Sequence, residues 1–259
     1  MIMAFHHQKE LCYLTFESFA GLPHGVFTRR GGVSPAPWST LNVGGSVGDD
    51  MVHVRENRVR SFAALGRDAD SLHDVWLVHG TDVVYAEAPR DLSLKSPQAD
   101  LLFTDNPNVT LFMRFADCVP LLFHDPKKGV VGISHAGWMG TVKGVAKASI
   151  AAMKARYGSD PRDVRAAIGP SIGPDHYEVG ADVAEQVRAS FGAQAESLLE
   201  PRGDRFHLDL WSANRIQLEE AGVGNVEVSG ICTACHLDDW FSHRAEKGKT
   251  GRFGALLSL

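Results

Sequence analysis

The stretch from residue 101 to residue 134 constrains the fold more than any other part of the chain. It holds apolar, β-rich segments at 101–104, 109–115, 119–124 and 130–134, separated only by short turns. Segments of this kind in direct succession predict neighbouring strands, because short connections join elements that are adjacent in space. The sequence therefore favours sheets built from groups of strands over a simple doubly wound parallel sheet.

Other strands and four helices are expected outside this stretch. β-branched and aromatic residues predict strands at 11–16, 25–28, 75–78, 82–86, 164–168, 206–208, 226–228 and 254–257. Helical periodicity predicts helices at 50–65, 140–157, 181–191 and 209–221. In the first helix, Val52, Val59, Phe62 and Leu65 are expected to share the buried face. The fold class predicted is α/β (α+β), with mixed β-sheets in the core and helices packed outside.

Length and composition limit the class of protein. The chain has 259 residues, 44% of them hydrophobic and 22% charged, and no convincing linker, which predicts a single catalytic domain over residues 1–259. A net charge of −5 argues against non-specific nucleic-acid binding. No apolar run is long enough to span a membrane. The N-terminus does not resemble a signal peptide, so the four cysteines are expected to be reduced thiols in the cytoplasm.

One cysteine and two histidines stand next to predicted strands in specific local phrases. His79 follows an apolar run and precedes a glycine, Cys118 lies between two apolar runs, and His135 follows the strand predicted at 130–134. A thiolate with two imidazoles is a ligand set for zinc that leaves one of four positions open for catalysis. Each residue alone fits a structural role better. Together they predict a metal site.

Residues around Cys118 support a functional reading. Arg114 and Asp117 lie within an otherwise apolar stretch, where a charge is costly unless it is paired or functional. Pro120 cannot donate a hydrogen bond to a central ladder, so it predicts an edge strand or a bulge. A bulge would also be needed to turn Asp117 to the same side as Cys118.

The phrases Val-His-Gly at 78–80, Ala-Asp-Cys-Val-Pro at 116–120 and His-Ala-Gly-Trp at 135–138 resemble those of the purine nucleoside phosphorylase family. Members of this family were once described as multicopper polyphenol oxidases or laccase-domain proteins, and one bacterial branch is called the peptidoglycan editing factor. The similarity extends over nearly the whole chain. Further matching phrases lie at 28–34, 39–42, 48–50, 56–58, 169–172, 177–180, 232–233, 241–244 and 250–252.

The resemblance implies a catalytic zinc held by His79, Cys118 and His135. It also implies phosphorolysis of adenosine, inosine, guanosine and methylthioadenosine, with adenosine deamination as a companion activity and purine nucleosides and phosphate as partners. The fold expected with it is a layered sandwich of the cysteine-hydrolase-like type. Two positions depart from the family pattern: Met139 stands where arginine is usual, and Leu77 where glutamine is frequent. No oligomeric state is indicated.

Phosphorolysis requires groups that bind phosphate and groups that contact the nucleoside. Arginine suits phosphate because its planar fork makes paired charge-assisted hydrogen bonds. Arg29 and Arg244 are the candidates for catalysis and substrate binding, whereas Arg252 is expected to be a solvated surface charge. Asn42 is a candidate for binding ribose or base, although it is equally suited to a turn. Asp117 is expected to orient a ligand or relay a proton.

Several other functions fit parts of the sequence. Cys118 and His135 would also suit a cysteine hydrolase acting on peptidoglycan precursors, in which they serve as nucleophile and base. A copper polyphenol oxidase fits less well, because the twelve histidines include no His-x-His pair. A structural zinc in a binding module would require a fourth protein ligand.

The segment from Cys232 to His236 has the CxxCH pattern of c-type haem attachment, which is discounted without an export signal. With His176 and Glu178 it also imitates the zinc-deaminase signature, but Ile231 stands in place of the usual proline.

Overall fold

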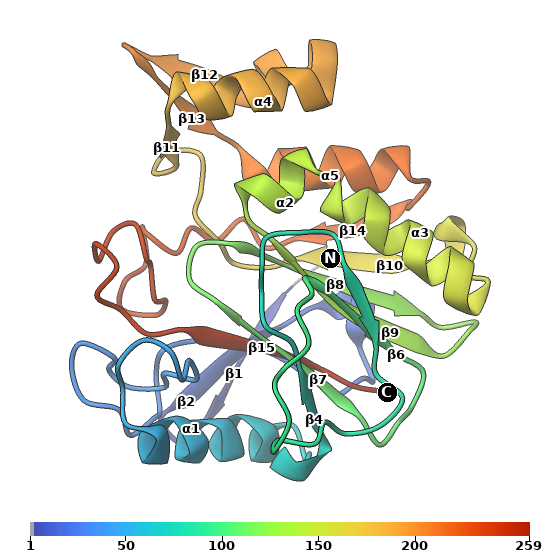
Figure 1. The fold of residues 1–259 in the computed structure, drawn as a ribbon. Helices are drawn as coiled ribbons and strands as arrows, with labels where there is room; N and C mark the ends of the chain where they lie inside the picture. Colours follow the sequence, from blue (N-terminus) through green and yellow to red (C-terminus); the bar gives the residue numbers. More distant parts are fainter. Residues whose placement is uncertain (1–2) are drawn as a thin grey trace.

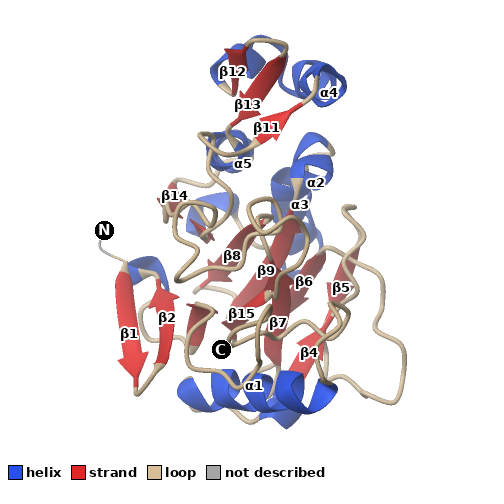
Figure 2. Cartoon of the chain, turned by 90° about the vertical axis from the view of Figure 1, so that its left-hand side faces the viewer, coloured by secondary structure: helices blue, strands red, loops and turns tan. Residues whose placement is uncertain are grey.

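The computed structural model describes residues 3–259, and its core is built in four layers: a helix, two six-stranded sheets face to face, and a group of helices (Figures 1 and 2). The first sheet has the order β1-β2-β3-β15-β7-β4, formed by β1 (Ala4–Gln8), β2 (Leu11–Thr15), β3 (His24–Phe27), β4 (Leu72–Asp74), β7 (Thr110–Phe115) and β15 (Phe253–Leu257). The second has the order β14-β10-β8-β9-β6-β5, formed by β5 (Val83–Tyr85), β6 (Leu101–Thr104), β8 (Val119–Asp125), β9 (Val130–Ala136), β10 (Arg165–Ile168) and β14 (Asn225–Val228).

Helices cover the outer faces of both sheets. Helix α1 (Met51–Ala64) lies against the first sheet, and α2 (Trp138–Val142), α3 (Val145–Tyr157) and α5 (Leu210–Glu220) lie against the second (Figure 1). A small third sheet of β11 (Glu178–Val179), β13 (Arg205–Leu208) and β12 (Leu199–Arg202) stands beyond them with α4 (Ala181–Phe191). The predicted mixed sheets with helices outside are thus confirmed, while the cysteine-hydrolase likeness stays a prediction.

The alternation of apolar residues along the central strands explains the layers. On β8, Leu121 and Phe123 pack toward the helices, whereas Leu122 packs between the two sheets. On β7, Met113 points between the sheets and Phe112 toward the layer of α1. Successive side chains of a strand alternate between faces, so a strand that is apolar on both faces must be covered on both sides.

Both large sheets are mixed. Most neighbouring strands run antiparallel, but β4 is parallel to β7, β5 to β6, and β14 to β10. The parallel pair of β10 and β14 brings two loops to the same edge of the second sheet, because parallel strands end on the same side.

Three features of the strands differ from prediction. Residues 75–78 do not form a strand: the carbonyl of Val75 accepts from Arg114, and Trp76 makes only an isolated bridge to Gln98. The strand here is β4, three residues earlier, and β1, β11 and β12 were not predicted. Exposure explains the omission of β1, whose residues are all exposed and have no apolar pattern.

Pro120 lies in a central strand and not at an edge. It is tolerated because it is the second residue of β8, before the register with β10 begins at Leu121.

Two predicted helices also need correction. Val52 and Val59 are exposed. Helix α1 buries Val54, Asn57 and Ser61 beside the expected Phe62, and the Asn57 side chain hydrogen-bonds to the loop that precedes the helix. The segment 140–157 is two helices, divided at Gly144, whose φ of +82° interrupts the helical backbone. Within residues 3–259, no helix combines the length and apolar character needed to cross a membrane.

Substitution of Gly132 in β9 would test how tightly the second sheet is packed. A Cβ atom on Gly132 would overlap the ring of Phe103, which is fully buried and packs against Phe123. We expect Gly132→Ala to lower the free energy of unfolding by about 1–3 kcal/mol, measured by urea denaturation. Gly224→Ala is the control, because open space surrounds that position, and should change stability by less than about 0.5 kcal/mol. Equal stability of the two variants would contradict the packing described.

Candidate metal centre

The fold brings the three predicted metal ligands together. One donor atom from each of His79, Cys118 and His135 lies within 4.8 Å of the other two, and the two rings meet edge to face with their centroids 4.9 Å apart. Cys118 lies in the turn between β7 and β8, and His135 in β9 beside it. His79 lies in the loop after β4 rather than directly at a strand end. Their convergence across the inter-sheet space is therefore a product of the tertiary fold.

Asp100, which sequence analysis did not identify, holds two of these residues in place. One carboxylate oxygen accepts from the His79 backbone N–H at 3.0 Å and lies 2.8 Å from Nδ1 of His135. The other accepts from the N–H groups of Val78 and Gly80 at 3.1 and 2.7 Å. Asp100 is completely buried, so these bonds are shielded from water. The signal in the sequence was an acidic residue directly before an apolar strand.

The loop carrying His79 has an unfavourable backbone that Asp100 supports. His79 has φ of +58°, which is uncommon for residues other than glycine. Gly137 lies opposite, where a Cβ would stand 3.0 Å from the Cys118 sulfur and 2.9 Å from the His79 ring. The phrase His-Ala-Gly-Trp therefore needs its glycine to leave room beside the sulfur.

The electrostatics of the three groups are strongly coupled. Burial alone would raise the pKa of the Cys118 thiol, but the His135 and His79 rings outweigh burial and lower that pKa to about 6. Burial would lower the pKa of His135, but the Cys118 thiolate and Asp100 raise it. The thiolate is the form of cysteine that binds metals and acts as a nucleophile.

This donor set fits a divalent metal such as zinc. With Nδ1 of His135 turned to Asp100, its Nε2 is left for a ligand, which is the usual arrangement of a carboxylate behind a metal-binding histidine. The three donors leave a fourth tetrahedral position. A cavity of about 80 Å³ opens beside them, lined by His79, Asp117, Cys118, Gly137, Trp138, Met139, Ile172, Tyr177 and Leu210. It is smaller than the roughly 300–1,000 Å³ of ordinary ligand pockets, so it suits a reacting centre and not a whole nucleoside.

Asp117 lines the cavity, but its carboxylate is already engaged. One oxygen accepts from the Thr233 hydroxyl at 2.7 Å and the other from the Arg244 backbone N–H at 2.7 Å. The expected bulge is instead a tight turn, in which Asp117 has φ of +80°. The geometry therefore gives Asp117 a positioning role and leaves the proton relay without support.

The two predicted phosphate-binding arginines lie in different surroundings. Arg29 donates to backbone carbonyls of Ser39 and Leu237, pairs with Glu246 at 3.1 Å and covers the ring of Phe241, and it does not line the cavity. Its guanidinium thus joins loops, which is a structural role, and its role in binding phosphate stays a prediction. Arg244 is exposed and does not line the cavity either. Its guanidinium donates to the Glu178 carbonyl at 2.7 Å and lies 5.1 Å from the centroid of the ring of Tyr177, which does line the cavity.

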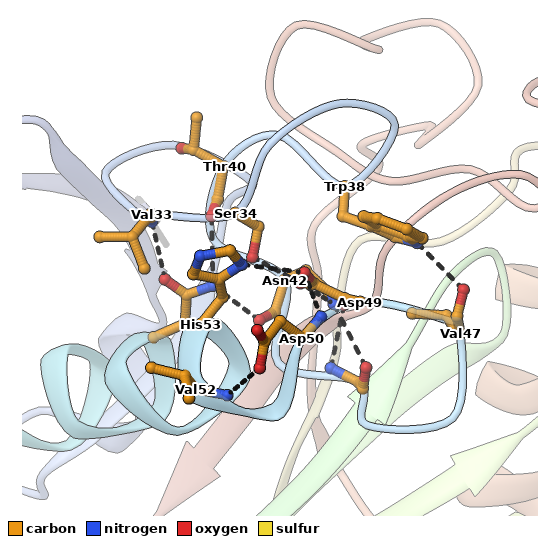
Figure 3. Close-up of polar contacts among 12 residues, drawn as sticks. Val33, Ser34, Trp38, Thr40, Asn42, Val47, Asp49, Asp50, Val52 and His53 are labelled. Carbon is orange, nitrogen blue, oxygen red and sulfur yellow. Dashed lines mark hydrogen bonds and ion pairs between the residues drawn. The ribbon is translucent and has the colours of Figure 1, made fainter.

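Asn42 has a structural role in the loop that precedes α1 (Figure 3). It is fully buried, its amide donates to Asp49 and to the Gly44 carbonyl, and its oxygen accepts from the N–H groups of Gly44 and Arg252. Every hydrogen-bonding site of the side chain is thus occupied, as befits a turn. These contacts favour the alternative of a turn residue over the predicted contact with ribose or base, which no observation here tests.

Arg252 is not the solvated surface charge that was expected. Together with Leu77 and Arg114 it lines a second small cavity of about 120 Å³. Burial lowers its pKa, while Cys118 and Asp117 act in the opposite direction, so the guanidinium lies within their electrostatic reach. Two larger hollows, of about 720 and 710 Å³, are lined by neither Arg114 nor Arg252 nor by the three predicted metal ligands, although Arg29 lines the second hollow.

Comparison with known proteins gives consistent matches over nearly the whole chain. The family model described as multi-copper polyphenol oxidoreductase laccase matches residues 23–259. A purine nucleoside phosphorylase of Deinococcus radiodurans is 44% identical over 92% of this chain and 89% of its own, and the purine nucleoside phosphorylase YlmD of Geobacillus stearothermophilus is 38% identical over 92% and 90%. The crystal structure of YlmD from G. stearothermophilus superposes with a TM-score of 0.92 at 35% identity, covering 99% of both chains. A Bacillus licheniformis protein, YfiH, gives 0.92 at 34% identity, covering 98% of both.

The carboxylate of Asp100 offers a test of the centre. In Asp100→Asn, an amide N–H would face backbone N–H donors, and the support behind His135 would weaken. We expect the affinity for Zn²⁺ to fall about 10–100-fold, measured by competition with a chelator. Asp105→Asn, at the exposed far end of β6, is the control and should bind Zn²⁺ as the unmodified protein does. Unchanged affinity in Asp100→Asn would refute this role for Asp100.

Proposed function

This chain belongs to the purine nucleoside phosphorylase family with the laccase-type family model, and we propose from this that it is a zinc-dependent phosphorylase of purine nucleosides. The proposed substrates are adenosine, inosine, guanosine and methylthioadenosine together with phosphate, and adenosine deamination is a second activity. The observation that carries the zinc dependence is the cluster of His79, Cys118 and His135 beside a cavity.

The cluster is chemically suited to catalysis because its protein donors fill three positions and leave a fourth for a reacting group. A metal bound there supplies Lewis-acid chemistry, polarising a substrate atom or activating a water molecule. Asp100 orients His135 and the His79 loop, and Gly137 leaves space beside the Cys118 sulfur.

In phosphorolysis, a phosphate oxygen forms a bond to C1′ of the ribose as the bond from C1′ to the purine nitrogen breaks, and the base leaves with the electron pair. The products are ribose-1-phosphate and the free purine. The proposed anion-binding residues are Arg244, which stacks on the cavity-lining Tyr177, and Arg252, which lies within electrostatic reach of Cys118 and Asp117. Asp117 acts through the Arg244 backbone, which it holds by a hydrogen bond of 2.7 Å.

Two departures from the family pattern lie at these cavities. Met139 lines the cavity beside the metal ligands, and Leu77 lines the one beside Arg252. Neither side chain is charged, so neither supplies the fixed positive charge or hydrogen bonds of an arginine or glutamine. We propose that both positions affect substrate preference and anion binding in this chain.

A cysteine hydrolase is the second candidate, because one observation favours it. The lowered pKa of Cys118 and the raised pKa of His135 describe a thiolate beside a protonated imidazole, which is the pairing of a cysteine nucleophile with its base. The two candidates differ in their need for metal. A phosphorylase of this type requires zinc, whereas a hydrolase survives chelation and is lost on thiol alkylation.

A product assay distinguishes these reactions. Purified protein given inosine and phosphate should release hypoxanthine and ribose-1-phosphate, and a strong chelator should abolish this release until Zn²⁺ is restored. With adenosine, release of ammonia measures the deamination. Cys118→Ala and His135→Ala should each lose the zinc ion of this cluster, seen as a lower zinc content than that of the unmodified protein by elemental analysis, and lose both activities. Free ribose in phosphate-free buffer, or full activity in the zinc-free protein, would contradict the proposal.

Substitutions of Arg244 and Arg29, the two arginines first considered for phosphate binding, should have different effects on the KM for phosphate and on stability. Arg244→Ala should raise the KM for phosphate about tenfold or more, since a charge-assisted hydrogen bond contributes about 1.5–3 kcal/mol. Arg29→Ala should leave that KM unchanged and lower the free energy of unfolding by about 1–2 kcal/mol, because the partly buried Ser39 carbonyl and the Glu246 carboxylate lose their donor. A raised phosphate KM in the stably folded Arg29→Ala protein would restore Arg29 as an anion ligand.

A further inference from the structure

A second group of metal-binding side chains lies outside the candidate active site. It consists of Asp175, His176, Cys232 and Cys235, called the clip cluster below. One donor atom from each residue lies within 4.8 Å of all the others. Two cysteines spaced as Cys-x-x-Cys, together with a histidine, are a frequent ligand set of structural zinc sites. We propose that the clip cluster binds a second zinc ion, which has a structural and not a catalytic role.

The distances within the cluster agree with a tetrahedral site. Bonds of about 2.3 Å to sulfur and about 2.0–2.1 Å to nitrogen and oxygen place tetrahedral donors about 3.6 Å apart for sulfur with nitrogen or oxygen, and about 3.4 Å apart for nitrogen with oxygen. Nδ1 of His176 lies 3.5 Å from the Cys235 sulfur and 3.8 Å from the Cys232 sulfur. The Asp175 oxygen lies 3.6 Å from the Cys235 sulfur and 3.5 Å from Nδ1 of His176. All four separations match a tetrahedron to within a few tenths of an ångström.

The backbone around the cluster is built to hold the two halves together. The loops that follow the parallel strands β10 and β14 run side by side, with a parallel bridge between Ser171 and Cys232 and a hydrogen bond of 3.0 Å from Thr233 N–H to the Ser171 carbonyl. Gly173 N–H donates to the Cys232 sulfur at 3.2 Å, a type of support that stabilises a thiolate ligand. A Cβ on Gly173 would lie 3.0 Å from Trp211 and 3.1 Å from the Cβ of Cys232, so this close approach requires glycine.

The cluster differs from the candidate active site in its coordination. The active-site cluster has three protein donors and an adjoining cavity, whereas the clip cluster has four donors and leaves no position for a substrate. A closed set of four protein ligands is typical of structural zinc, and an open set of three is typical of catalytic zinc. The chain would therefore hold two zinc ions with separate roles.

The position of the cluster explains what a structural ion would do. Tyr177, which lines the active-site cavity, directly follows His176, and Thr233, whose hydroxyl holds Asp117, directly follows Cys232. An ion bound to both loops would tie the wall of the cavity to the residue that precedes Cys118. Asp175, His176 and Cys235 are exposed, so an ion from solution can reach the cluster.

Zinc content of the full-length protein, purified under reducing conditions, tests the proposal. The unmodified protein should hold about two zinc ions per chain, and Cys235→Ser and His176→Ala about one each, because each removes a ligand from a four-ligand site. His236→Ala is the matched control: this exposed histidine neighbours Cys235 but lies outside the cluster, so its zinc content should equal that of the unmodified protein. Equal zinc content in the control, in Cys235→Ser and in His176→Ala would overturn the proposal.

A Cys118→Ala background separates the two sites. Because this variant lacks an active-site ligand, Zn²⁺ added to its metal-free form should raise Tm through the clip cluster, and the double variant Cys118→Ala/Cys235→Ser should show no rise. If Cys118→Ala retains no zinc and its Tm does not respond to Zn²⁺, the proposal fails while the active-site zinc stands. If Cys118→Ala keeps all zinc and Cys235→Ser loses it, the clip cluster stands and the zinc-dependent function fails. A disulfide between Cys232 and Cys235 in the intact mass of the freshly purified protein would also overturn the proposal.

Discussion

The carboxylate of Asp100 is the interaction on which the candidate active site depends. It satisfies three consecutive backbone N–H groups of the His79 loop and the Nδ1 position of His135. A buried carboxylate is costly unless it is hydrogen-bonded, and here both oxygens have two partners. One side chain thereby supports the unfavourable backbone at His79 and sets the tautomer of His135 in which Nε2 is available. Without it, the loop after β4 has no strand ladder to fix its position.

The layered core supplies the frame for this arrangement. The two sheets face each other through apolar side chains, so the turn that carries Cys118, between β7 of one sheet and β8 of the other, is held from both sides. Helices α2 and α5 add Met139 and Leu210 to the cavity wall. Of the three predicted metal ligands, only His135 lies within a strand, whereas His79 and Cys118 lie in a loop and a turn. The loop after β10 adds Tyr177 to the wall, and a second ion on that loop would fix its position.

The three arginines show that tertiary contacts give residues of the same type different surroundings and roles. Arg29, Arg244 and Arg252 all lie in family-like phrases, yet Arg29 is engaged with carbonyls and Glu246, Arg244 is exposed and stacks on Tyr177, and Arg252 is partly buried near Cys118. The phrases alone do not distinguish these environments, because each depends on segments far away in the chain. Asn42 illustrates the same point: its turn at Gly44 was expected from the local sequence, whereas its hydrogen bonds with Asp49 and Arg252 were not.

Local pattern was sufficient for most of the strands and for the extent of α4, because alternation and helical periodicity report the burial of each face directly. It failed for the exposed β1, for the face of α1, and for the division at Gly144, where polar contacts and backbone conformation decide the outcome. The sequence by itself determined which residues can bind a metal, since thiol and imidazole chemistry belongs to the residue type. Only the tertiary structure decided that three of them meet around one point, that Asp100 supports them and that four others form a closed cluster, because these proximities are set by the packing of two sheets and not by spacing along the chain.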